Sequence, residues 1–348
     1  MNGMMHHVSS RNILPEPNLF LGGVGVTITT ATILAIKMGI DEDNIFNFQI
    51  DANDNISCYI DITVVGFSII SNGPVGGIYD TTTYVVDLGN VIGTITGVSS
   101  FQNFDLLKVF HSNNLTQISG GSVFRDINGT KALTTIIFPN LTTVSNTIVC
   151  RGSTSIEYVI FNECLTLGGG TFQSIAAGNM KRIRLQKVTL IGSSNSTAQG
   201  TFQVPSGTQI YVNPTMFTAD GGSLEADLQQ AIDTYSANVI SIDDTTPPSA
   251  VSDLSASSIT SSGCDLDFTP PSSTNALDFY EVWVENIDLD LWHVDRVAGR
   301  YTINQEITSS GDTITGLTTG TNYKIWIIAC DEYWNRSEIS NVIEITTL

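Results

Sequence analysis

Apolar residues recur at a nearly constant interval along the middle of the chain, from about residue 84 to residue 212. Each interval holds two short apolar segments separated by a polar turn. The first segments align at Val86, Val109, Ile136, Val159 and Ile183. The second segments align at Ile95, Ile118, Val144, Leu167 and Leu190. A repeat with a period of roughly 25 residues predicts short strands that stack on one another, because a single unit is too small to bury its own apolar face.

A phenylalanine preceded by glycine or small polar residues marks a third position of the repeat. It occurs at Phe101, Phe124, Phe172 and Phe202. After the repeat, Leu224, Leu228 and Ile232 share one face at helical spacing, with Ser223 as the expected N-cap. We expect this helix to cover the open end of the stacked strands.

We interpret residues 1–80 as a small α+β region that attaches the chain to a partner. A short helix is expected over 29–38, with Gly39 as its stop. Residues 45–50 alternate between apolar and polar, which indicates a strand with one buried face. With a polar turn at 51–55 and a second apolar run over 56–65, this strand predicts a hairpin.

The repeat unit LTTIIFPNLTTV, at 133–144, resembles a unit of the BspA-like leucine-rich repeat family, L-x-x-I-x-[IF]-P-x-x-[LV]-x-x-[IL]. The matching residues are Leu133, Ile136, Phe138, Pro139, Leu141 and Val144. The resemblance covers about 84–214 and implies a solenoid. The chain departs from the family in unit length, and it lacks the regular Ala-Phe helix signature, so turns are expected in place of helices. We therefore interpret 81–244 as a leucine-rich-repeat-like solenoid with a helical cap.

A polar, proline-containing linker at 243–248 introduces a segment of different character. Residues 245–348 resemble a fibronectin type III domain. The marks, in chain order, are Pro247, Pro248, Leu254, Phe268 where the family usually has Trp, Pro270, Pro271, Tyr280, Val282, Val284, Ile314, Leu317, Tyr323, Ile325, Ile327, Ala329, Ser337 and 342–347. The resemblance implies a seven-stranded sandwich with an adhesive or spacing role and no catalysis. The chain as a whole is predicted to be mainly β and multidomain, divided at 1–80, 81–244 and 245–348.

Strand alternation also predicts where two cysteines of this last segment lie. Tyr323, Ile325 and Ile327 share one face of a strand, so Cys330 points away from the sandwich core. Cys264 shares the inward face of its own strand. We therefore expect no disulfide between Cys264 and Cys330.

Net charge excludes some classes of partner. Lys and Arg number 14 against 34 Asp and Glu, which gives a formal charge of −20. This balance argues against nucleic acid or an anionic membrane as the main partner. The longest apolar runs are too short to cross a bilayer, and the first residues lack the basic and apolar regions of a signal peptide. We expect synthesis in the cytoplasm without export by a signal peptide.

Two small groups of residues are candidates for binding. The first is a basic cluster at 181–187, in which Arg182 and Arg184 are expected to point outward from a strand. Three interpretations of this cluster are open: a solvated face, a contact with an anionic glycan, or ion pairs with carboxylates of another copy of the chain. The second is Trp292 with His293, beside an acidic stretch, where the aromatic ring could stack on a sugar.

Chemistry-bearing motifs are otherwise sparse. The four histidines lie far apart, the acidic residues of the repeat follow no recurrent phase, and neither GxSxG nor HExxH occurs. We expect no catalytic residues, no metal and no cofactor.

Both recognised modules are binding or spacing devices, although proteins that carry them outside cells usually have export signals. Virion proteins of bacteriophages are made in the host cytoplasm and released by lysis. The Asn-, Asp-, Ile- and Thr-rich composition also resembles proteins from phages of gut Bacteroidetes. The sequence thus favours a structural fibre or appendage protein of a virion. Its expected partners are other virion proteins, further copies of itself in a homo-oligomer such as a trimer, and a host surface glycan or protein. The alternative is a BspA-like bacterial cell-surface adhesin.

Overall fold

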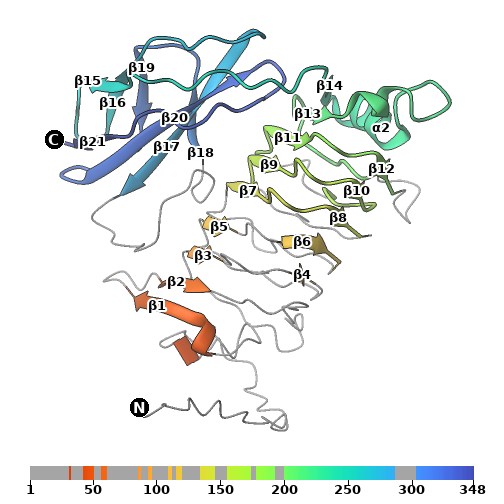
Figure 1. The fold of residues 1–348 in the computed structure, drawn as a ribbon, viewed down its shortest axis with the longest axis horizontal. Helices are drawn as coiled ribbons and strands as arrows, with labels where there is room; N and C mark the ends of the chain where they lie inside the picture. Colours follow the sequence, from red (N-terminus) through yellow and green to blue (C-terminus); the bar gives the residue numbers. More distant parts are fainter. Residues whose placement is uncertain are drawn as a thin grey trace, which may run out of the picture.

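The computed structural model consists of a stack of short strands and a separate sandwich that lies against its side (Figure 1). The structure describes residues 31–32, 42–50, 56–60, 85–87, 93–95, 109–111, 115–119, 134–145, 155–173, 178–192, 200–286 and 303–348. Below, "the stack" denotes strands β3 to β14, and "the sandwich" denotes strands β15 to β21. Trp292, His293, Phe101, Phe124, the turn at 51–55 and the expected helix, apart from residues 31–32, lie outside the described residues.

The larger sheet has nine strands in the order β1-β2-β3-β5-β7-β9-β11-β13-β14, so β1 and β2, from the segment 1–80, extend the sheet of the stack beyond β3. Its strands are β1 Ile45–Ile50, β2 Ile56–Ile60, β3 Val85–Asp87, β5 Val109–His111, β7 Thr135–Ile137, β9 Tyr158–Ile160, β11 Arg182–Leu185, β13 Gln209–Val212 and β14 Asn238–Ser241. β1 and β2 form the expected antiparallel hairpin, which follows the 3₁₀ turn Glu42–Asn44. From β2 onward every pairing in this sheet is parallel.

The smaller sheet of the stack takes the second strand of each repeat. Its order is β12-β10-β8-β6-β4 and all pairings are parallel. The strands are β4 Gly93–Ile95, β6 Leu115–Ile118, β8 Thr143–Val144, β10 Thr166–Leu167 and β12 Leu190–Ile191. Because successive strands alternate between the two sheets, the chain winds as a coil whose turns lie one above another (Figure 1).

The core of the stack lies between the two sheets and is built from ladders of residues at the same position of successive turns. Ile136, Val159, Ile183 and Ile210 pair in register in the larger sheet, and all are buried. Phe172 and Phe202 also pair between turns, and their rings stack with centroids 5.5 Å apart. This pair agrees with the expected third position of the repeat.

Two members of the predicted ladders are displaced by one residue. Phe110, not Val109, pairs with Val86 in the larger sheet. In the smaller sheet Leu167 pairs with Ile191, so Leu190 is not the inward residue. Ile191 is 7 % exposed, whereas Leu190 is 57 % exposed. Both slips occur where two apolar residues are adjacent, because spacing alone cannot tell which of them faces the core.

The predicted helix is present as α2, Ala226–Tyr235, but it begins later than expected. Its N-cap is Glu225, whose carboxylate accepts a hydrogen bond from the Leu228 N–H; Ser223 lies before the cap. Leu228 and Ala231 pack into the core of the stack. The helix follows a 3₁₀ turn, Pro214–Phe217, and precedes β14, so it covers the end of the core while the larger sheet continues.

The sandwich is formed by a three-stranded sheet and a four-stranded sheet. The first contains β15 Ser255–Ser257, β16 Gly263–Asp267 and β19 Asp312–Thr315. The second, in the order β18-β17-β20-β21, contains β17 Leu277–Asn286, β18 Ile303–Ile307, β20 Asn322–Asp331 and β21 Ile343–Thr346. All pairings within the two sheets are antiparallel.

Side-chain directions in the sandwich follow the predicted alternation. Tyr323, Ile325 and Ile327 contribute to its core together with Cys264. Cys330 lies on the opposite face of β20, and both cysteines are free, as expected. The Thr318 N–H donates to Tyr323 Oη at 2.8 Å, which ties the turn before β20 to that strand.

The register at the end of the smaller sheet predicts different costs for two adjacent substitutions. We expect Ile191→Ala to lower the free energy of unfolding by about 2–4 kcal/mol, because it leaves a cavity in the core. Leu190→Ala removes an exposed side chain and is expected to cost less than about 0.5 kcal/mol. Urea unfolding of both variants measures the difference. The assigned register would be contradicted if Leu190→Ala proved the more costly.

Candidate functional site between the stack and the sandwich

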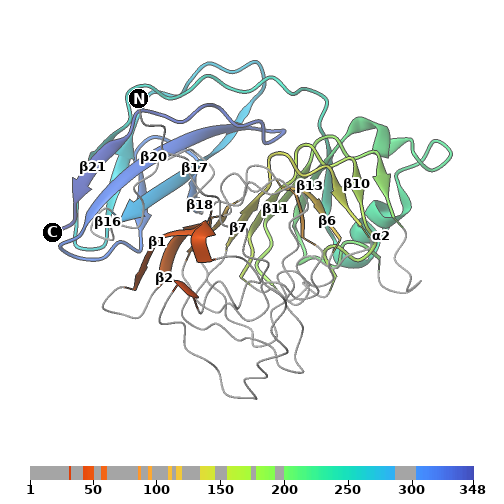
Figure 2. The same ribbon diagram turned by 60° about the horizontal axis from the view of Figure 1, so that its bottom comes forward.

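The outward face of the larger sheet is covered by the four-stranded sheet of the sandwich. Both views place the four-stranded sheet, with its edge strand β18, beside the strands of the larger sheet (Figures 1 and 2). A separate apolar cluster fills this boundary. From the stack it takes Ile137, Tyr158, Ile160, Tyr211 and Ile242, and from the sandwich Phe279, Trp283, Trp326, Ile328, Cys330 and Trp334. The sandwich thus buries residues on both sides of its four-stranded sheet.

Trp334 is the central aromatic residue of this interface. It follows β20, adopts a left-handed backbone conformation with φ of 55°, and is completely buried. Its ring centroid lies 5.8 Å from that of Tyr211, 6.3 Å from that of Tyr158 and 6.5 Å from that of Phe279. One indole therefore contacts rings from both sides of the interface, an arrangement that contributes both area and orientation.

Glu281 supplies a fully buried carboxylate behind Trp334. It accepts hydrogen bonds from Trp334 Nε1 at 2.7 Å and from Trp283 Nε1 at 3.1 Å. Arg336 makes an ion pair with it, with Nη2 to Oε2 at 2.8 Å. A buried charge is costly unless it is paired and hydrogen-bonded. Here a cation and two indole N–H groups satisfy the carboxylate, and in doing so they hold Trp334 in place.

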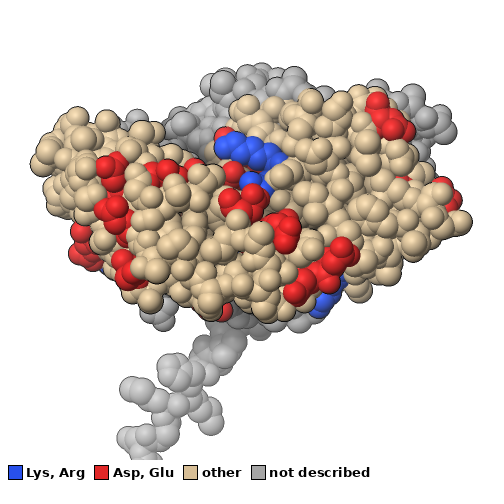
Figure 3. Space-filling view, turned by 90° about the horizontal axis from the view of Figure 1, so that it is seen from above, with Lys and Arg blue, Asp and Glu red and all other residues tan. Residues whose placement is uncertain are grey.

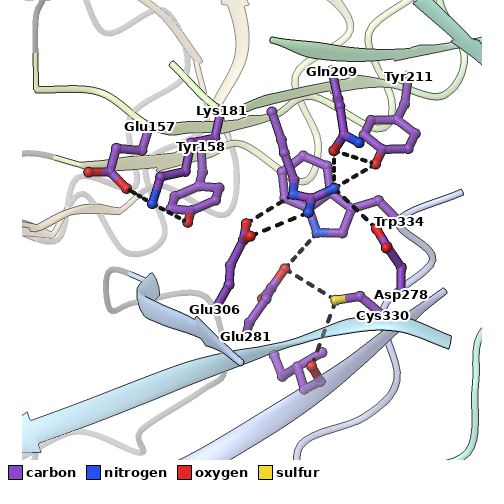
Figure 4. A network of polar contacts seen from close by, with 12 residues as sticks. Glu157, Tyr158, Lys181, Gln209, Tyr211, Asp278, Glu281, Glu306, Cys330 and Trp334 are labelled. Atoms are coloured by element: carbon purple, nitrogen blue, oxygen red, sulfur yellow. Dashed lines mark hydrogen bonds and ion pairs between the residues drawn. The ribbon is translucent and has the colours of Figure 1, made fainter. Parts of the chain in front are cut away.

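Arg182 of β11 crosses the interface to carboxylates of the sandwich. Figure 4 shows its partners Glu306, Asp278 and Tyr211. Its Nε and Nη2 atoms donate to the two carboxylate oxygens of Glu306 at 2.9 and 3.3 Å. Nη1 donates to Tyr211 Oη at 2.7 Å, to Gln209 Oε1, and to Asp278 Oδ2 at 3.4 Å. The guanidinium also lies 3.7 Å from the centroid of the Phe279 ring. Such two-pronged binding of a carboxylate adds geometric specificity to the charge attraction.

Arg184 makes the second polar crossing, through neutral oxygens. Its Nη2 donates to Asn335 Oδ1 of the sandwich, and its Nε donates to the carbonyl of Tyr333 at 3.4 Å. Asn335 is itself held by Asp331, to which its Nδ2 donates at 2.9 Å. Burial, reinforced by the nearby charge of Arg336, lowers the pKa of Arg184 to about 10.

The buried phenols of the interface have raised pKa values. Burial raises the pKa of Tyr211 to about 12, although the charge of Arg182 opposes the shift. Burial also raises the pKa of Tyr158, with contributions from the charges of Glu306 and Glu157. Both phenols thus remain neutral hydrogen-bonding groups at physiological pH.

The basic cluster predicted from the sequence is divided by this geometry. Arg182 and Arg184 do point outward from the stack, but they are only 8 % and 3 % exposed because the sandwich covers them. The carboxylates that pair with Arg182 belong to its own chain, not to another copy. Lys181 and Lys187 pair with Glu157 and Glu163 of the preceding turn, each at 2.7 Å. We therefore do not assign these four residues to an external ligand.

Sequence reasoning overlooked the sandwich side of the interface. The sequence pattern did not identify Trp283, Trp326 or Trp334, although one signal was available for β20. Residues 325–330 form an unbroken apolar run, whereas a strand with one solvated face alternates. Such a run indicates that β20 is covered on both faces.

Charged side chains are unevenly distributed over the surface of the molecule. Seen from above, acidic side chains are spread over both lobes, while basic side chains are few and lie in a small patch between the sandwich and the stack and again at the lower edge of the view (Figure 3). Within the described residues, no group of three or more His, Cys, Asp or Glu side chains could hold a metal ion. No helix among them is long and apolar enough to cross a membrane. The contacts of the interface therefore join the stack to the sandwich.

Residues 248–346 match the sequence pattern of the family described as Fibronectin type III domain. The sandwich is a fibronectin type III domain. Solved structures similar to it include the domain of human fibronectin type III domain containing protein 3, at 19% identity with a TM-score of 0.24, covering 30% of this chain and 90% of that one. The FN5 domain of Drosophila Lar shows 17% identity and a TM-score of 0.21, covering 29% and 96%. An FN3 domain of human collagen XX shows 21% identity and a TM-score of 0.20, covering 30% and 94%.

These likenesses concern the fibronectin type III domain, and at such scores they carry no argument about function. A search of curated proteins found no match.

Removal of Arg182 is predicted to weaken the joint between the stack and the fibronectin type III domain. Arg182→Ala leaves the carboxylate of Glu306 without its forked partner in a largely buried site, and we expect a loss of about 2–4 kcal/mol in the free energy of unfolding. The matched control is Lys187→Ala, which breaks a half-exposed ion pair and should cost about 0–1 kcal/mol. Guanidinium unfolding gives both values, and equal losses would contradict the role assigned to Arg182.

The phenols of the interface are predicted to resist alkaline titration. Between pH values of about 10 and 12, an unfolded chain loses the Tyr211 proton while the folded chain keeps it, so the Tyr211 contribution to stability falls as pH rises. Arg184 has the opposite sign over the same range, because its pKa is lowered. We therefore choose phenolate absorbance as the readout instead of stability.

At a pH of about 10.5, folded Tyr211→Phe protein should show the same phenolate absorbance as the unaltered protein. In denaturant, where all 10 tyrosines titrate together, the variant should show one tyrosine less. A loss of phenolate signal in the folded variant would show that Tyr211 is accessible to solvent.

Proposed function

We propose that the chain is a non-enzymatic structural and adhesive protein of a bacteriophage particle, such as a head or tail fibre or another appendage. Residues 1–80 dock it to other virion proteins. The stack and the fibronectin type III domain project from the particle and present a surface to a glycan or protein of the host.

The observation that carries this proposal is the joint itself. Flexibly linked domains usually share small and polar interfaces, and they move relative to one another. Here the fibronectin type III domain shares a buried aromatic cluster with the stack, crossed by Arg182 and Arg184. A unit joined in this way keeps a binding surface at a constant angle to its anchor, which suits a display protein.

The repeat supports the same proposal. Its nearly constant period and in-register apolar ladders are consistent with the leucine-rich-repeat-like solenoid that we propose for 81–244. Such solenoids and fibronectin type III domains are both used for binding or spacing. The net charge of −20 favours a protein that stays soluble when many copies are crowded on one particle.

Peptide mass spectrometry distinguishes this proposal from a bacterial cell-surface adhesin. Density-purified particles and washed cell envelopes from the producing culture would be compared. We expect peptides of this chain in stoichiometric amounts in the particles. Peptides found in the envelope and missing from the particles would refute the virion role and favour the adhesin.

The docking role of the segment 1–80 is tested by deletion. A chain lacking 1–80 loses β1 and β2 and leaves β3 at the edge of the larger sheet. The later turns and the fibronectin type III domain should stay folded, because their shared interface lies within 137–334. The truncated chain should no longer be incorporated into particles. Circular dichroism of the purified truncated chain controls for folding, and its presence in particles would count against docking by this region.

A further inference from the structure

The smaller sheet presents a second broad face, on the side of the stack away from the fibronectin type III domain (Figure 1). Four turns each contribute a four-residue segment to this sheet, at 115–118, 141–144, 164–167 and 188–191. In each segment the first and last residues point into the core, and the two between them point outward. The outward residues, referred to below as the outer face, are Thr116, Gln117, Thr142, Thr143, Leu165, Thr166, Thr189 and Leu190.

Leucine side chains and threonine methyl groups form much of the apolar part of this outer face. Thr142 Oγ1 donates to the carbonyl of Thr116 at 3.0 Å, and Thr189 Oγ1 donates to the carbonyl of Leu165 at 3.5 Å. A threonine whose hydroxyl is turned toward the neighbouring turn presents its methyl group to solvent. Leu165 and Leu190, on adjacent strands, are 47 % and 57 % exposed and add the largest apolar side chains.

Charge distinguishes the outer face from the rest of the molecule. None of its eight residues is charged, although the chain carries 34 acidic and 14 basic residues. At its border, Glu163 and Lys187 neutralise each other at 2.7 Å. In a chain of net charge −20, a face without charge is where two copies meet with least repulsion.

We propose that the outer face is a contact surface for a second copy of this chain. A glycan is a poorer fit, because none of the eight residues is aromatic and the hydroxyls of Thr142 and Thr189 are engaged by the backbone. Nucleic acid and anionic membranes would require basic side chains. A second copy offers the same flat, methyl-bearing surface and completes an apolar contact.

The size of the outer face implies weak association. Four short strands offer only a few hundred Å² per copy, below the area that supports a stable dimer on its own. Association then becomes effective where copies are held at high local concentration, and this part of the inference rests on the proposed role in a particle. The contact would order neighbouring copies and leave the fibronectin type III domains on the far sides of the stacks.

Sedimentation velocity of the purified full chain tests the contact without any particle. We expect reversible dimers to appear between about 10 µM and about 1 mM protein, the range of small transient interfaces. Leu190→Asp places a charge in the contact and should raise the dissociation constant at least about tenfold. Thr142→Asp, on another turn of the same face, should do the same.

Val342→Asp is the matched control, because Val342 is an exposed apolar residue, at 46 % against 57 % for Leu190, on the fibronectin type III domain. It should leave the dimer unchanged, and thermal melting of all variants verifies that they fold. A protein that stays monomeric throughout the range, or a dimer that persists in both aspartate variants of the outer face, would overturn the proposal. Dimers in solution without peptides in particles would refute the virion role alone.

Discussion

The structure depends on the cover that the fibronectin type III domain gives to one face of a parallel sheet. Tyr158, Ile160 and Tyr211 project from that face and would expose a large apolar patch if it were uncovered. The domain that covers it carries Trp283 and Trp334 on its own outer side. Each surface is therefore the partner of the other, and the two regions share one buried interface although each has its own core.

The linker contributes less to this arrangement than the side chains do. It leaves the end of the stack after β14, and the domain folds back over turns that precede it in the chain. Asn335 Nδ2 donates to the Asp244 carbonyl at 2.9 Å, which fastens the linker to the loop that also binds Arg184. A single asparagine thus joins the linker, the stack and the domain.

Sequence periodicity predicted the inward half of this structure well and the outward half poorly. Core positions such as Ile136, Val159 and Ile183 repeat because each must fill the same space in every turn. Outward positions obey no such constraint: Tyr158 and Arg182 are neighbours across strands, yet they have nothing in common along the chain. The roles of Trp334 and Asn335 could not be predicted, because they lie in a loop and act on side chains far earlier in the sequence.

Apolar and polar contacts of the interface have different consequences. Apolar side chains such as Ile160 and Ile328 gain nearly as much from burial in several alignments of two sheets, so they favour contact without specifying the alignment. The fork of Arg182 on Glu306 and the bond from Arg184 to Asn335 permit far fewer alignments, since a small shift leaves a buried cation without its acceptors. Replacing Arg182 and Glu306 together by apolar residues is therefore expected to leave stability largely unchanged, because no buried charge loses its partner, while it loosens the orientation that the proposed display role requires.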